Sequence, residues 1–155
     1  MEIRRYSSDD LAGIIRLCAI EKWPSFGQDA ARANRALTAP GVTTVVAVDD
    51  GEVVGFAQLQ SDGEIQAHLS LIAVDKRHRR RGVGRDLIET ALRIAGGQRV
   101  DLVTDTASDF YSRLPHFRML GFPLFPLYTG PDHEVPDLYW KDGMKVAEPE
   151  KENCG

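Results

Sequence analysis

One stretch decides the fold: Asp75-Lys76-Arg77-His78-Arg79-Arg80-Arg81-Gly82-Val83-Gly84-Arg85. The residues before it, from Leu69 to Val74, are apolar and typical of a strand, and residues 83–95 have the spacing of an amphipathic helix. The N–H groups at the start of a helix have no partner within the helix and lie at the positive end of its dipole. A strand, a basic turn with two glycines and a helix start therefore predict a site for an anion.

The composition of this turn narrows the anion to a polyphosphate group. Six Lys or Arg side chains lie between residues 76 and 85, and Gly82 and Gly84 remove side chains where a phosphate would touch the backbone. The chain has no P-loop string and lacks the third glycine of a dinucleotide-binding fingerprint. The alternative is a solvated basic turn, which needs neither two glycines nor this density of charge.

The composition of the whole chain fits a globular protein of one domain. Its 155 residues are enough for a buried core, with a hydrophobic content of 43% and a charged content of 27%. No apolar run is as long as a membrane span and no signal-peptide pattern follows Met1, so we expect a cytoplasmic protein with no membrane partner. Cys18 and Cys154 are too few for a disulfide framework. The net charge is −4, whereas nucleic-acid binding usually needs a broad basic surface, so no nucleic-acid partner is expected.

The pattern of apolar residues, turns and breakers predicts a mixed sheet with helices on both faces. Strands are expected at residues 2–6, 43–48, 53–60, 64–74, 100–104, 122–128 and 137–145, and helices at residues 11–23, 29–37, 83–95 and 107–114. We see no repeat and no linker, which predicts one domain over residues 1–147. The charged residues 148–155 are expected to form a disordered tail.

The motif Arg79-x-x-Gly82-x-Gly84, after a strand that ends in Val74, resembles the acyl-CoA-binding motif of the GNAT family of N-acetyltransferases. The predicted order of elements resembles a GNAT domain as well. The resemblance implies an α/β (α+β) fold: a mixed, mostly antiparallel central sheet of about seven strands, helices on both faces and a splayed parallel pair in the middle. It also implies direct transfer of an acetyl group, in a ternary complex, from acetyl-CoA to a primary amine of a small molecule or peptide.

The resemblance further implies where acetyl-CoA is held. The pyrophosphate would lie on the amides of roughly residues 81–85. The pantetheine arm would pair with the strand before the loop, where that strand separates from residues 100–104, and an amide near Ile72 or Ala73 would face the thioester oxygen. The residues assigned to the cofactor are Leu71, Ile72, Ala73, Val74, Arg79, Arg80, Arg81, Gly82, Val83, Gly84 and Arg85.

Attack by an amine needs a base that removes its proton. His68 is the first candidate, because histidine titrates near neutrality and relatives carry a catalytic glutamate or histidine at a similar place on this strand. Glu64 is the second candidate. The alternative for His68 is a hydrogen-bonded histidine with a structural role, and the alternative for Glu64 is a solvated residue at the start of the strand. Alternation with period two puts one set of residues on a single face: Glu64, Gln66, His68, Ser70, Ile72 and Val74.

The leaving thiolate needs a proton, and Tyr111 is the candidate acid. The family often has a tyrosine four residues before a Gly-Phe pair, and here Gly121 begins such a pair. The residue four before Gly121 is Phe117, which has no proton to give. Either Tyr111 is the acid and the residues after it are an insertion, or this chain has no tyrosine as the acid and Tyr111 packs in the core.

In this fold the segments that match residues 23–30 and 128–139 usually line the acceptor pocket. They offer Trp23, Phe26, Asp29 and Tyr128, and aromatic rings beside a carboxylate would suit a cationic amine. Ordinary loop composition is the alternative. The histidines show no paired ligand spacing, so no metal is expected. A homodimer is an expectation from the family, in which dimers are common.

Two rival functions stay open. The first is a non-catalytic acyl-CoA-binding sensor or regulatory module of the same fold, which the broken tyrosine spacing favours. The second is a nucleic-acid-binding adaptor that uses the basic loop.

Overall fold

The computed structural model describes residues 1–97, 99–104 and 107–119. The two strands expected at residues 122–128 and 137–145, the tail at 148–155 and the candidate Tyr128 lie outside the described residues. The extent of the domain, residues 1–147, stays a prediction. Within the described residues, no helix is long and apolar enough to cross a membrane.

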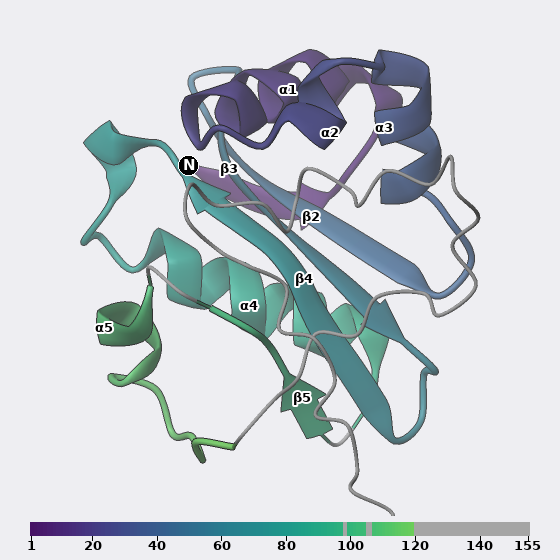
Figure 1. Ribbon diagram of the computed structural model, residues 1–155. Coiled ribbons are helices and arrows are strands. Elements are labelled where there is room, and N and C mark those ends of the chain that lie inside the picture. Colours follow the sequence, from purple (N-terminus) through teal and green to yellow (C-terminus); the bar gives the residue numbers. More distant parts are fainter. Residues whose placement is uncertain (98, 105–106, 120–155) are drawn as a thin grey trace, which may run out of the picture. The chain divides into compact units, whose positions relative to one another are not determined.

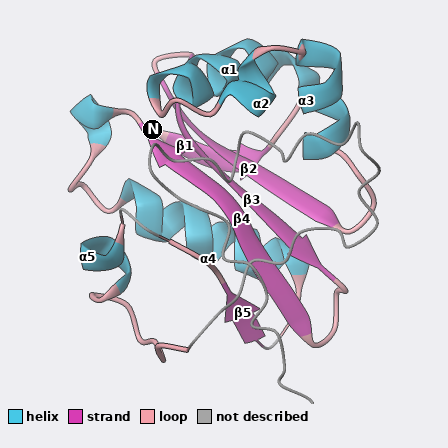
Figure 2. Ribbon diagram, in the orientation of Figure 1, coloured by secondary structure: helices cyan, strands magenta, loops and turns pink. Residues whose placement is uncertain are grey.

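The centre of the fold is a mixed sheet of five strands in the order β1-β2-β3-β4-β5 (Figures 1 and 2). Strands β1 to β4 are antiparallel, and β4 and β5 are parallel. The expected mixed, mostly antiparallel sheet with one parallel pair is thus confirmed, with fewer strands than the seven predicted, because the last two fall outside the described residues. The strand bounds are β1 Glu2–Arg5, β2 Val42–Asp49, β3 Glu52–Ser61, β4 Gln66–Val74 and β5 Arg99–Asp101.

Helices cover both faces of this sheet, as Figure 1 shows. Helices α1 (Leu11–Ile20), α2 (Pro24–Gly27) and α3 (Ala30–Leu37) lie together on one face, which we call the α1 side. Helix α4 (Val83–Ala95) lies on the other face, the α4 side. Short 3-10 turns precede α1 and α4 at Ser8–Asp10 and Lys76–His78, and the one-turn helix α5 spans Ser108–Tyr111.

Each face has its own hydrophobic core. On the α4 side the predicted stripe of α4 is confirmed, since Val83, Leu87 and Ala91 are buried against residues of β2, β3 and β4. On the α1 side Ile14 and Leu17 pack with Phe56 of β3. Burial of these two apolar surfaces is what holds the sheet between its helices.

A bulge in β4 corrects the predicted arrangement of its faces. Leu69 pairs with Leu59 and Leu71 pairs with Gln58, so Ser70 is an extra residue with no partner on β3. Because a bulge shifts the alternation by one residue, the side chains before and after it change faces. His68 therefore shares the α1 side with Leu71 and Ala73, and not the α4 side with Ile72 and Val74. The prediction of one shared face was wrong because a bulge leaves no mark on the apolar pattern.

Several boundaries also differ from those predicted. Strand β4 begins at Gln66, because the Asp62 carboxylate accepts hydrogen bonds from the N–H groups of Glu64, Ile65 and Gln66 and holds a turn there. Helix α1 ends at Ile20, and strand β5 and helix α5 are each shorter than expected. Local propensity marks the centre of an element better than its ends.

Candidate functional site

At the end of the basic turn between β4 and α4, the N–H groups of residues 83–85 have no backbone hydrogen-bond partner among the described residues. Arg80 and Gly82 both have positive φ, 61° and 86°, and Gly82 is the N-cap of α4. The first hydrogen bond of the helix runs from the N–H of Asp86 to the carbonyl of Gly82, at 3.0 Å. The N–H groups of residues 83–85 precede that bond and lie at the positive end of the dipole of a 13-residue helix.

The two glycines of the motif have different physical reasons. Gly82 needs its positive φ, a conformation that residues with a side chain rarely adopt, and a Cβ there would meet little else. Gly84 gives room to α5: a Cβ on it would lie 3.2 Å from Cζ of Phe110 and 3.9 Å from Cδ1 of Ile72. Gly84 thus lets Phe110 pack against the first turn of α4, a role that the sequence did not reveal.

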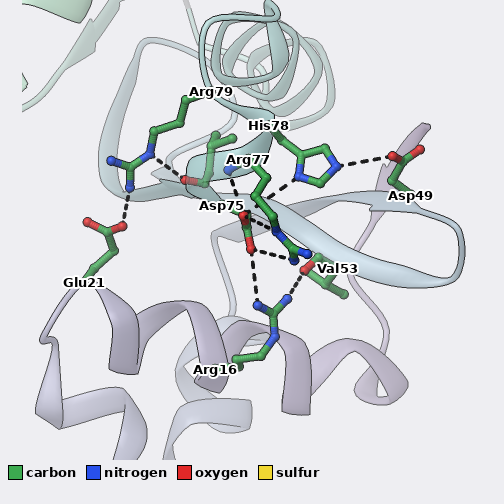
Figure 3. Close-up of polar contacts among 9 residues, drawn as sticks. Arg16, Glu21, Asp49, Val53, Asp75, Arg77, His78 and Arg79 are labelled. Carbon is green, nitrogen blue, oxygen red and sulfur yellow. Dashed lines mark hydrogen bonds and ion pairs between the residues drawn. The ribbon is translucent and has the colours of Figure 1, made fainter.

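Three of the basic side chains make hydrogen bonds or ion pairs within the fold, and Figure 3 shows two of them, Arg77 and Arg79. Arg77 pairs with Asp75, and Arg79 donates to the carbonyl of Val74 at 2.8 Å and pairs with Glu21 at the end of α1. Arg85 pairs with Glu89 one turn along α4. The other three are exposed and make no ion pair with a residue that the structure describes: Lys76, Arg80 and Arg81.

Asp75 is the buried anchor of the loop, at the point where β4 ends. Its carboxylate accepts the N–H of Arg77 at 2.9 Å and pairs with Arg16 of α1 at 3.4 Å, and Arg16 also donates to the carbonyl of Val53 (Figure 3). Hydrogen bonds from Arg77, then the charge of Arg77 and a further hydrogen bond from Arg16, hold the pKa of Asp75 well below its usual range. The anionic carboxylate thus joins the loop to α1 and to β3.

The edge of β4 that faces β5 is paired over only part of its length. The pairing covers Gln66 to His68, opposite Arg99 to Asp101. On its other edge β4 stays paired with β3 as far as Val74, opposite Gly55. Within the described residues the backbone from Leu71 to Val74 therefore has no strand partner on the β5 side, and this open edge leads directly into the basic turn.

His68 and Asp101 lie side by side where the pairing of β4 with β5 ends. They are register partners, and Nδ1 of His68 lies 2.7 Å from Oδ1 of Asp101. Both side chains line an open cavity of about 640 Å³, whose other walls come from the α3–β2 loop and from the β3–β4 turn. Sequence reasoning missed Asp101. A signal existed, because Asp101 is a polar residue in an apolar strand expected to run parallel to β4.

Comparison with known proteins assigns the family. The sequence model described as the acetyltransferase (GNAT) family matches residues 8–122. The chain belongs to the GNAT family. No curated protein matches the sequence.

Solved structures of acetyltransferases are similar over most of the chain. One is an acetyltransferase of Trypanosoma brucei, 24% identical, with a TM-score of 0.62, over 79% of this chain and 99% of that chain. Another is an aminoglycoside acetyltransferase from an uncultured soil metagenomic sample, in complex with trehalose. It is 21% identical, with a TM-score of 0.64, over 81% of this chain and 95% of that chain. A third is the aminoglycoside N-acetyltransferase AAC(6')-Iy in complex with CoA. It is 19% identical, with a TM-score of 0.70, over 83% of this chain and 95% of that chain. At these identities the likeness shows the GNAT fold.

In this GNAT domain the candidate acid Tyr111 lies on the α4 side. Its ring packs against the core beneath α4 and meets the ring of Phe110 edge to face, with centroids 4.9 Å apart. Burial raises the pKa of the Tyr111 hydroxyl, which keeps it protonated at neutral pH. Tyr111 thus directly follows Phe110, whose ring packs against Gly84 in the first turn of α4.

The other candidates are more dispersed. Glu64 lies in the exposed β3–β4 turn, before β4 begins. Trp23 and Phe26 are half-buried against the α1-side core. The carboxylate of Asp29 caps α3 by accepting the N–H of Arg32 at 2.9 Å.

Neither a metal nor a nucleophilic thiol emerges from the part of the chain that the structure describes. No group of three or more His, Cys, Asp or Glu residues there is arranged to hold a metal ion. Cys18 is buried in the α1-side core, and burial raises its pKa to about 12. A thiol with that pKa is not a nucleophile at neutral pH.

Proposed function

We propose that this GNAT protein is an acyl-CoA-dependent N-acyltransferase that moves an acetyl group from acetyl-CoA to a primary amine. One observation carries the proposal. The open edge of β4 leads into the basic turn, where Gly82 with its positive φ begins α4 and the first N–H groups of that helix are free. Such a turn suits a diphosphate, and an unpaired strand edge suits the amides of a pantetheine arm. Membership of a family of acetyltransferases supports the same reading.

In this proposal the pyrophosphate rests on the amides of residues 81–85. Arg80 and Arg81 add charge from exposed side chains, and Lys76 is close in sequence. Arg79 acts differently, because its guanidinium donates to the carbonyl of Val74 and pairs with Glu21. In this proposal it stabilises the loop and does not bind the phosphates. The pantetheine arm lies along Leu71 to Val74, and an amide near Ile72 or Ala73 donates to the thioester oxygen as negative charge develops there.

The transfer is a direct attack in a ternary complex. His68 takes a proton from the ammonium group, and the amine nitrogen then attacks the thioester carbonyl carbon. A carbon–nitrogen bond forms, the carbon–sulfur bond breaks, and the thiolate of CoA leaves. The nitrogen then carries one hydrogen too many for an amide and releases it to solvent. Tyr111 donates its proton to the thiolate and regains one from solvent. Glu64 stays the second candidate for the base.

The acceptor is proposed to be an amine of a small molecule or peptide. Two similar structures are aminoglycoside acetyltransferases, and aminoglycosides are small cationic molecules with primary amines. Trp23, Phe26, Asp29 and Tyr128 are kept as proposed contacts, with the limit that the Asp29 carboxylate already caps a helix. A cytoplasmic location is part of the proposal, because the buried free thiol of Cys18 fits a reducing compartment.

Thiol release tests this function. Purified protein is mixed with acetyl-CoA and a panel of aminoglycosides, amino acids, polyamines and peptides, and free CoA is measured with a thiol reagent. We expect release that depends on one class of amine, together with binding of CoA in calorimetry. Binding of CoA without release on any amine would favour the sensor, and salt-dependent binding of DNA or RNA unaffected by CoA would favour the nucleic-acid adaptor.

A further inference from the structure

The contact between His68 and Asp101 joins the two strands at the last residue pair of their short pairing. Nδ1 of His68 lies 2.7 Å from Oδ1 of Asp101, the distance of a strong charge-assisted hydrogen bond. A carboxylate accepts hydrogen bonds and donates none, so this contact requires the proton on Nδ1. The neutral ring then has its lone pair on Nε2.

We propose that Asp101 is the positioning residue of the transfer reaction: it fixes the tautomer and the orientation of His68, so that Nε2 meets the incoming amine. The inference rests on the proposed function, in which His68 is the base. Without Asp101 the ring would turn about its bonds and share its proton between both nitrogens. A base whose lone pair points elsewhere cannot take the proton of the substrate.

The surroundings of the pair favour a role in positioning over a role in stability. The side chains of His68 and Asp101 are 43% and 56% exposed, and an exposed ion pair adds little to folding. Both line the cavity of about 640 Å³, so an amine that enters it reaches the imidazole from solvent. In the described residues Asp62 is the other carboxylate of that cavity, and its Oδ1 already accepts three backbone N–H groups.

The proton path follows from this geometry. Nε2 of His68 takes the proton of the ammonium group, and the ring becomes an imidazolium whose Nδ1–H still donates to Asp101. The carboxylate stays ionised and stabilises that positive charge. The imidazolium passes its proton to solvent after the amide has formed, which returns the same tautomer for the next cycle.

A rival reading makes the pair a clamp for the register of β4 and β5. The two readings differ in which other properties change. A positioning residue acts on the chemical step through His68, so Asp101→Asn should lower kcat and leave the melting temperature and the affinity for CoA unchanged. Loss of a clamp would lower the melting temperature and change the affinity for CoA, in Asp101→Asn and in His68→Ala alike.

The experiment is a double-mutant cycle with Asp101→Asn and His68→Ala. Asparagine keeps the volume and can still hydrogen-bond, but it accepts and donates alike and so does not select a tautomer. We expect Asp101→Asn to lower kcat by about tenfold or more while KM for acetyl-CoA stays within about twofold. In the His68→Ala background we expect no further loss. Glu2→Gln, with the same change of charge on β1 at the opposite edge of the sheet, is the matched control.

Nitrogen-15 NMR of the neutral His68 ring gives a second readout that needs no substrate. We expect a protonated Nδ1 in the wild type and a mixture of tautomers in Asp101→Asn. A proton on Nε2 in the wild type, unchanged kcat in Asp101→Asn, or an equal loss in the His68→Ala background would each overturn the inference. If the wild type turns over no amine, the proposed function fails instead, and the NMR result still decides whether Asp101 selects the tautomer.

Discussion

The two ends of β4 differ in almost every property that matters for chemistry. At its beginning β4 is paired on both edges, and His68 meets a carboxylate from β5 beside an open cavity. At its end β4 has no strand partner on the β5 side among the described residues, and the chain turns through a positively charged loop into α4. We propose that the first end moves a proton and that the second holds an anion.

The bulge at Ser70 gives the two ends of β4 different faces. It turns His68 to the α1 side, while Ile72 and Val74, beyond it, face the α4 side. The hydroxyl oxygen of Ser70 is buried and has no hydrogen-bond partner among the described residues. A single inserted residue thus separates a paired segment from an open one within nine residues of strand.

The largest effect is expected at the open end, with Gly82→Asp. A carboxylate against a diphosphate repels it by about 4 kcal/mol at about 4 Å near a protein surface, so CoA affinity should fall by about 100-fold or more in calorimetry. Gly82→Asn is the matched control, because asparagine has the same size and tolerates positive φ. Equal affinity of the Asp and Asn variants would remove the phosphate from this turn.

The paired end is tested by His68→Ala. Loss of the base should lower kcat by about 100-fold, measured as thiol release with a productive amine. CoA affinity should stay within about twofold of the wild type, because the anion site lies at the other end of the strand. A large loss of CoA affinity would mean that the two ends do not act separately.

Tyr111→Phe examines the acid with a smaller expected change. Removal of the hydroxyl leaves the thiolate to take its proton from solvent, so kcat should fall by about tenfold. The ring stays in the α4-side core, so the melting temperature and CoA affinity should change little. Wild-type turnover would return Tyr111 to a role in packing.

The smallest effect is a change in stability with Asp75→Asn, at the junction of β4 and the loop. The lost carboxylate leaves Arg16 and Arg77 with weaker partners, and we expect a decrease of about 1–2 kcal/mol in the free energy of unfolding at neutral pH. Glu89→Gln, which breaks the exposed pair with Arg85, should cost less than about 1 kcal/mol.

The pH dependence of this difference follows from the pKa of Asp75. The folded pKa lies below the ordinary value of 3.8, so the anion stabilises the fold above that pH. This contribution is lost as the pH falls from about 4 toward the lowered pKa of the folded state. The difference in the free energy of unfolding between wild type and Asp75→Asn, measured by urea unfolding, should therefore become smaller below pH 4. A gap that stays constant would show that the charge of Asp75 is not what stabilises the loop.

Much of the fold was predictable because its signals are local. Between the strands expected at residues 43–48 and 53–60, Asp50-Gly51 is a pair typical of a hairpin turn. The two residues adopt the positive φ values, 48° and 80°, that such a turn requires. The stripe of α4 and the glycine that opens it were predicted for the same reason. The ends of β4, β5 and α5 were less predictable, because side-chain caps and partner strands set them.

By itself the sequence determined the family, the basic loop that opens α4 and the order of the described strands and helices. Each of these follows from residue spacing and backbone preference over a short stretch. Only the tertiary structure decided which face His68 occupies, that Asp101 is its partner, that Arg79 is held by Glu21 and that Gly84 makes room for Phe110. The three contacts join residues that are 26 to 58 positions apart in the sequence, and the bulge is a single inserted residue. A local pattern does not encode a neighbour from a distant part of the chain.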